Sequence, residues 1–122
     1  MIDHVGIQVV DLAGARQFYD AVLETLGYRM LMDVGPAVGY GADHPVFWIE
    51  VATDRIRNRP SHLAFSAPSR AAVIDFHDAA LAFGTASLHA PRLWPEYHAG
   101  YFGAFVRDPD GNNVEAVHHT FG

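Results

Sequence analysis

Apolar and polar positions along the first half of the chain change from strand spacing to helix spacing and back. Residues Asp3–Val10 alternate as a half-buried strand does, and Asp11 follows where a helix cap is expected. The apolar positions after it then recur at helical spacing, which predicts an inward face of Ala15, Phe18, Tyr19, Val22 and Leu26. Gly, Pro and Asp then separate three short predicted strands, which are Tyr28–Met32, Ala37–Gly41 and Val46–Ala52.

The second half of the chain repeats this order. "FYDAVL" and "FHDAAL" are the same segment 58 residues apart, and at this offset His4 falls on His62. The pattern predicts a strand over Ser61–Ala67 and a helix capped by Ser69, then three strands that end with Tyr101–Arg107 and Asn112–His118. The inward face of this helix is predicted to be Val73, Phe76, Ala80 and Phe83. We therefore expect a single α+β domain of two βαβββ modules, about 1–58 and 59–122, joined near Asn58–Pro60.

Composition limits the classes of function. A net charge of −6 without a face rich in Lys or Arg argues against nucleic acid as a partner. Apolar stretches fall short of the roughly 18 residues of a membrane helix, and the start does not look like a signal peptide. The lack of cysteine excludes disulfides and thiolate metal sites. We expect a cytoplasmic protein whose partner is a small molecule.

Four polar residues interrupt apolar strands in the two halves. They are His4 and His62 on the first strand of each module, and Glu50 and Glu115 on the last. Because side chains alternate along a strand, each is expected on the face turned away from the helix. A single strand His is more often only hydrogen-bonded, and a strand Glu is usually exposed, but here the pattern recurs in both halves. Two imidazoles and two carboxylates would suit one divalent ion: Zn, Ni, Co, Mn or Fe.

Three segments carry a resemblance to a known family. "DHVGIQVVDLAGARQFYDAVLETLGY", "SHLAFSAPS" and "AFVRDPDGNNVEAV" resemble the vicinal oxygen chelate superfamily, which includes glyoxalase I, extradiol dioxygenases and the fosfomycin and bleomycin resistance proteins. The resemblance implies a U-shaped half-barrel around a divalent metal, with His4, His62 and Glu115 at ligand positions. It also implies a homodimer, in which the modules pair either within a chain or between chains.

The fourth ligand position separates the subfamilies. "FWIEV" resembles the second-ligand strand of glyoxalase I and places Glu50 there, whereas extradiol dioxygenases use two His and one Glu. Those dioxygenases also tend to carry a catalytic Tyr where Phe105 stands here, and bleomycin resistance proteins usually lack the ligands. We expect a glyoxalase-type enzyme with lyase or isomerase chemistry, in which Glu50 or Glu115 moves a proton. The alternatives are an antibiotic-sequestering binding protein without a required metal and an extradiol-type dioxygenase.

Further residues are expected to contact the substrate. The aromatic connection "LWPEYHAGY" is longer than its counterpart in the first half and is expected near the mouth of the cavity. The expected contacts are Trp48, Tyr97, His98, Tyr101, Phe105 and Gln8.

Overall fold

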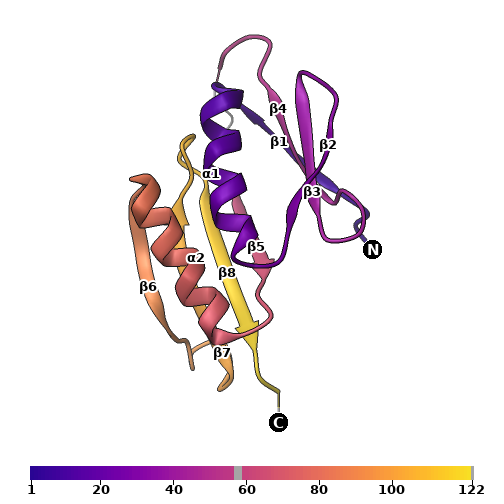
Figure 1. Cartoon of the computed structure of the whole chain (residues 1–122). Helices are drawn as coiled ribbons and strands as arrows, with labels where there is room; N and C mark the ends of the chain where they lie inside the picture. Colours follow the sequence, from indigo (N-terminus) through magenta and orange to yellow (C-terminus); the bar gives the residue numbers. More distant parts are fainter. Residues whose placement is uncertain (57–58, 122) are drawn as a thin grey trace.

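The described part of the chain forms two four-stranded sheets and two helices, whose arrangement can be followed in Figure 1. The computed structural model describes residues 1–56 and 59–121. The first module contains β1 (Val5–Val9), α1 (Leu12–Glu24), β2 (Arg29–Asp33), β3 (Ala37–Gly41) and β4 (Phe47–Val51). The second contains β5 (His62–Ser66), α2 (Arg70–Phe83), β6 (Ser87–Leu93), β7 (Tyr101–Arg107) and β8 (Asn113–His119).

The two sheets have the same topology. Their strand orders are β1-β4-β3-β2 and β5-β8-β7-β6, and in each the first strand runs parallel to the last while the other pairs are antiparallel. The predicted α+β fold of two βαβββ units is therefore confirmed. The predicted joint includes Asn58, which lies outside the described residues, so the division at 58/59 stays a prediction.

The predicted helix starts are confirmed by their caps. The Asp11 carboxylate accepts from the backbone N–H of Gly14, and the Ser69 hydroxyl accepts from that of Ala72. Two details differ from the prediction. His4 precedes β1, which begins at Val5, and Phe83 is 37% exposed because it is the last residue of α2.

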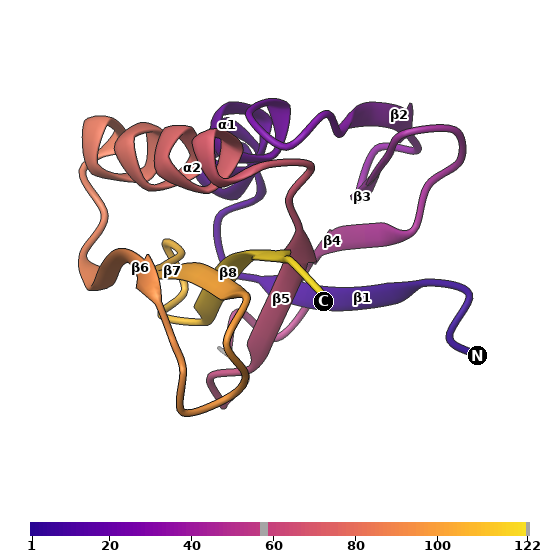
Figure 2. The same ribbon diagram turned by 90° about the horizontal axis from the view of Figure 1, so that it is seen from below.

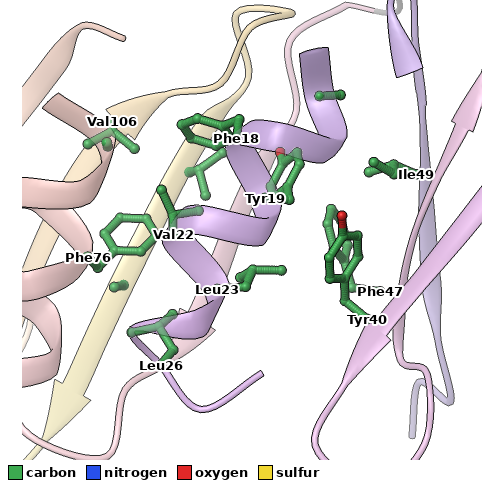
Figure 3. Close-up of a cluster of buried hydrophobic side chains, with 14 of the residues drawn as sticks. Phe18, Tyr19, Val22, Leu23, Leu26, Tyr40, Phe47, Ile49, Phe76 and Val106 are labelled. Carbon is green, nitrogen blue, oxygen red and sulfur yellow. The ribbon is translucent and has the colours of Figure 1, made fainter. Parts of the chain in front are cut away.

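Helix α1 has two apolar sides, which Figure 3 shows between the modules. Tyr19 and Leu23 point toward Tyr40 and Phe47 of the first sheet, whereas Phe18 and Val22 point toward the second module. The remaining labelled residues of this cluster are Leu26, Ile49, Phe76 and Val106. One continuous hydrophobic core therefore serves both modules, with α1 at its centre.

The "DPDG" turn between β7 and β8 also connects the modules. The carboxylate of Asp108, 3% exposed, accepts from the backbone N–H groups of Asp110 and Asn112 and from the Asn112 side-chain amide. The hydroxyl of Tyr19 on α1 donates to the same carboxylate at 2.6 Å. Burial, with the neighbouring Asp108 charge, raises the pKa of Tyr19, so this hydroxyl remains a donor.

Replacing Tyr19 with phenylalanine removes the donor that α1 gives to the buried Asp108. We expect the free energy of unfolding to fall by about 1.5–3 kcal/mol, the usual value of a hydrogen bond to a charged group. Urea denaturation measures this loss. The matched control is Tyr28→Phe, whose exposed hydroxyl donates to the Ser66 carbonyl, and it should cost at most about 1 kcal/mol. Equal losses in the two variants would contradict a special role for the Tyr19–Asp108 bond.

Both helices lie along one side of the molecule in Figure 2, with strands β1, β5 and β6–β8 along the other. Each sheet therefore has a second face that neither of the described helices, α1 and α2, covers. Among the described residues, no helix has the length and apolar character needed to cross a membrane. The cytoplasmic location expected from the sequence stays a prediction.

Candidate functional site

The second sheet brings one predicted ligand pair together. Nε2 of His62, on β5, lies 3.1 Å from Oε1 of Glu115, on β8. The side chain of His62 is half exposed, whereas that of Glu115 is only 2% exposed. A buried carboxylate is costly unless it has partners, and this one faces an imidazole at the surface.

Strand pairing explains why these side chains meet. Glu115 lies between Ala64 on β5 and Phe105 on β7, and His62 is two residues before Ala64 on the same face. Ala64 and Gly103, the small residues on the flanking strands, leave room beside the carboxylate. A Cβ atom added at Gly103 would come 3.2 Å from Oε2 of Glu115.

Tyr101 supplies the second partner of Glu115. Its hydroxyl donates to Oε2, the oxygen that does not face His62. Burial, together with this hydrogen bond, raises the pKa of Tyr101, so the phenol stays protonated and can only donate to the carboxylate. Sequence analysis expected Tyr101 to contact substrate, whereas the structure shows it bonded to a predicted metal ligand.

Aromatic side chains form a wall around this pair. The ring of Phe105 stacks on His62 with centroids 6.0 Å apart, and the buried Trp94 meets Phe105 edge to face. Tyr97, 59% exposed, stacks on the outer side of Trp94. His98 lies farther along the same connection, where its Nε2 is 2.9 Å from Nδ1 of His119.

The first module has a separate cavity of about 600 Å³. Its lining includes His4 and Glu50 together with Trp48, whose aromatic ring would lie 2.9 Å from a Cβ atom placed at Gly39. His4 is bonded through Nδ1 to the carboxylate of Asp3 at 2.7 Å, which leaves its Nε2 for another partner. The charged groups in its lining are Asp3 and Glu50, together with the imidazole of His4.

Strand register corrects one inference from the repeat. Gly6 pairs with Trp48, and its counterpart 58 residues later, Ala64, pairs with Glu115. Trp48 is therefore the structural counterpart of Glu115, whereas Glu50 pairs with the exposed Gln8, two residues farther along.

The register of β1 and β4 places His4 and Glu50, the predicted ligands of the first module, farther apart than His62 and Glu115. At about 3.3 Å per residue, Glu50 lies four positions, about 13 Å, along the sheet from His4, whereas Glu115 lies about 7 Å from His62. Across residues 1–56 and 59–121, groups of three or more His, Cys, Asp or Glu arranged to hold a metal are not found. The described part of a single chain therefore brings His62 and Glu115 together, but does not bring His4 and Glu50 to them.

The comparisons with known proteins agree with this fold. The family model described as "Glyoxalase/Bleomycin resistance protein/Dioxygenase superfamily" matches residues 1–116. The Bacillus subtilis (strain 168) protein YqjT is 28% identical, and the alignment covers 93% of this chain and 95% of that protein.

Solved structures are similar over nearly the whole chain. A glyoxalase/bleomycin resistance protein from Albidiferax ferrireducens T118 is 30% identical with a TM-score of 0.84, covering 96% of this chain and 98% of that one. A lactoylglutathione lyase from Agrobacterium tumefaciens has a TM-score of 0.70 at 23% identity, covering 97% and 92%, and shows likeness of fold alone. From its repeat, its paired sheets and the match over residues 1–116, this chain belongs to the glyoxalase/bleomycin resistance protein/dioxygenase superfamily.

Proposed function

We propose that this protein is a divalent-metal-dependent enzyme of the glyoxalase type, acting on a small oxygenated molecule. The observation that carries the proposal is the pair formed by His62 and the buried Glu115, 3.1 Å apart. Two donors that are each about 2.1 Å from one metal ion lie roughly 3.0–3.4 Å apart at octahedral or tetrahedral angles. The pair therefore fits two neighbouring positions of a metal site.

The rest of the ligand set is proposed to come from a second copy of the chain. The helices cover one face of each module, and each opposite face carries half of the predicted ligands, His4 with Glu50 or His62 with Glu115. A two-fold dimer would place the first half of one subunit against the second half of the other and so form two complete sites. This assembly supplies the homodimer expected from the sequence.

Glu50 is better suited to proton transfer than to ligation. Its register places it beyond Trp48 and about 13 Å along the sheet from His4, while it still lines the cavity. An exposed carboxylate beside an open cavity can accept a proton from a bound substrate. We therefore propose His4, His62 and Glu115 as the principal ligands, with Glu50, the fourth predicted ligand, as the base.

The bound metal would supply Lewis-acid stabilisation of negative charge on a chelated substrate oxygen. Trp48 and Phe105 are proposed to form opposite apolar walls around the substrate, one from each module. Tyr97, His98 and Gln8 remain proposed contacts at the rim. Trp94 holds the aromatic wall in place because its indole N–H donates to the Gly103 carbonyl at 3.0 Å.

The first experiment measures metal content and turnover together. We expect near-stoichiometric Zn, Ni, Co, Mn or Fe after purification, and turnover that a chelator abolishes and the metal restores. Lactoylglutathione, named in one structural neighbour, is the first compound to assay. Protein that binds aromatic compounds without metal or turnover would overturn the proposal in favour of the sequestering alternative. Metal-dependent oxygen uptake with a catechol would favour the dioxygenase alternative.

Replacing Glu50 with glutamine tests its proposed role as a base. Because the amide keeps the size of the side chain but cannot take the proton, we expect kcat to fall by about 10²–10⁴-fold with metal content retained. Inductively coupled plasma mass spectrometry and steady-state kinetics measure the two quantities. Loss of metal would instead make Glu50 a ligand, and an unchanged kcat would make it a surface carboxylate.

A further inference from the structure

Glu115 has different partners on its two carboxylate oxygens. Oε1 faces Nε2 of His62 at 3.1 Å, while Oε2 accepts the hydrogen bond from the hydroxyl of Tyr101. We propose that Tyr101 is a positioning residue, which fixes the Glu115 carboxylate so that Oε1 stays beside His62 as a paired metal donor. The inference rests on the proposed function, because it concerns the same ligand pair.

The sheet is built to let Tyr101 reach Glu115. The two residues are not opposite each other: Tyr101 pairs with His119, and Glu115 pairs with Phe105. The tyrosine ring must therefore extend along the sheet over Gly103, which lies between Tyr101 and Phe105 on the same face. A Cβ atom at Gly103 would be 3.2 Å from both Tyr101 Cε1 and Glu115 Oε2, so any side chain there would crowd this contact.

Neighbouring rings hold Tyr101 in this direction. Tyr97 meets it edge to face with centroids 4.9 Å apart, and His98 and His119 meet it in the same manner at 5.7 and 5.1 Å. A ring confined by three others has little rotamer freedom to lose when its hydroxyl forms a bond. The neighbouring rings thus direct the hydroxyl at Oε2.

This arrangement has a chemical consequence for Glu115. A carboxylate free to rotate could present either oxygen, or both, to a cation. With Oε2 engaged by the Tyr101 hydroxyl, Oε1 is the oxygen turned toward His62. Hydrogen bonds that orient a metal-binding carboxylate typically change metal affinity by about 10–100-fold when they are removed.

The test measures Zn²⁺ binding to the full chain by isothermal titration calorimetry, with the absorption spectrum of bound Co²⁺ as a second readout. We expect Tyr101→Phe to weaken Zn²⁺ binding by about 10–100-fold and to alter the Co²⁺ spectrum. Gly103→Ala should act in the same direction because its Cβ displaces the tyrosine ring. The matched control is Tyr28→Phe, which removes a hydroxyl bonded to Ser66 instead and should leave both readouts unchanged.

Thermal unfolding of every variant distinguishes a variant that fails to fold from one in which only the Glu115 carboxylate has lost its orientation. Wild-type Zn²⁺ affinity and Co²⁺ spectrum in a folded Tyr101→Phe protein would overturn the inference while leaving the proposed function intact. If Tyr101→Phe does not fold, the same result in Gly103→Ala overturns it. Failure of the wild-type protein to bind Zn²⁺ or Co²⁺ would overturn the inference, and failure to bind Ni²⁺, Mn²⁺ and Fe²⁺ as well would overturn the proposed metal enzyme.

Discussion

Replacing Glu115 with alanine is expected to weaken Zn²⁺ binding by more than about 100-fold and to abolish turnover. The substitution removes a proposed ligand from the pair with His62 and also leaves the hydroxyl of Tyr101 without its acceptor. Glu115→Gln keeps the size of the side chain and an acceptor for Tyr101, so it tests the charge alone. We expect it to fold as the wild type does and to lose at least about 10-fold in metal affinity, because its oxygen is uncharged.

Calorimetry with Zn²⁺ and thermal unfolding measure these effects. The matched control is Glu50→Ala, which removes an exposed carboxylate from the last strand of the other module. It should retain most of the metal affinity while losing turnover. Equal affinity in Glu115→Gln and wild-type protein would mean that Glu115 serves only the hydrogen bonds of the second sheet.

The repeat in the sequence was enough to predict the order of strands and helices along each module. Two strands and two helices 58 residues apart share their apolar spacing, and caps at Asp11 and Ser69 fix where both helices begin. Local signals of this kind depend on neighbours within one turn of helix or one strand, so they can be read without knowing the fold. The same alternation of faces predicted that His62 and Glu115 face the same way, and the pairing of β5 with β8 then brings them together.

The register of β4 could not be read in this way. Glu50 and Glu115 were matched because each is a carboxylate in the last strand of its module. The loops before these strands differ in length between the modules, so sequence position does not give the register. Strand pairing makes Trp48 the counterpart of Glu115. A shift of two residues keeps a side chain on the same face, so the alternating pattern does not reveal it. The sequence therefore placed Glu50 on the same face as Trp48 and His4, but it did not show that Glu50 lies two residues beyond the position that corresponds to Glu115.

Contacts between distant segments were also absent from the pattern. The hydrogen bond that the Tyr19 hydroxyl donates to Asp108 depends on how α1 packs against the second module. Tyr101 likewise reaches Glu115 only because Gly103 lies between them. The glycine was the available signal, since a residue without a side chain inside a strand often marks a close approach.

A mixture of two inactive variants is expected to regain activity if each site is shared between two subunits. His4→Ala damages the first-module half of the site, and Glu115→Ala damages the second-module half. In a mixed dimer, one site carries both substitutions. The other site takes its first-module half from the Glu115→Ala chain and its second-module half from the His4→Ala chain. Neither half of that second site is altered, so it is intact. Random mixing makes half of the dimers mixed, so turnover and bound metal should reach about a quarter of the wild-type values.

The control for this experiment is a mixture of His62→Ala with Glu115→Ala. Both substitutions lie in the second module, so each site of a mixed dimer contains one of them, and we expect no recovery. The two chains of each mixture carry different affinity tags, and purification through both tags in turn confirms that mixed dimers have formed.

Recovery in the first mixture and not in the second requires His4 of one chain to act with His62 and Glu115 of another. Mixed dimers that recover nothing in either case would rule out a site shared between subunits. A monomer at micromolar concentration, measured by light scattering, would do the same, because the described part of a single chain does not bring His4 to the second-module pair.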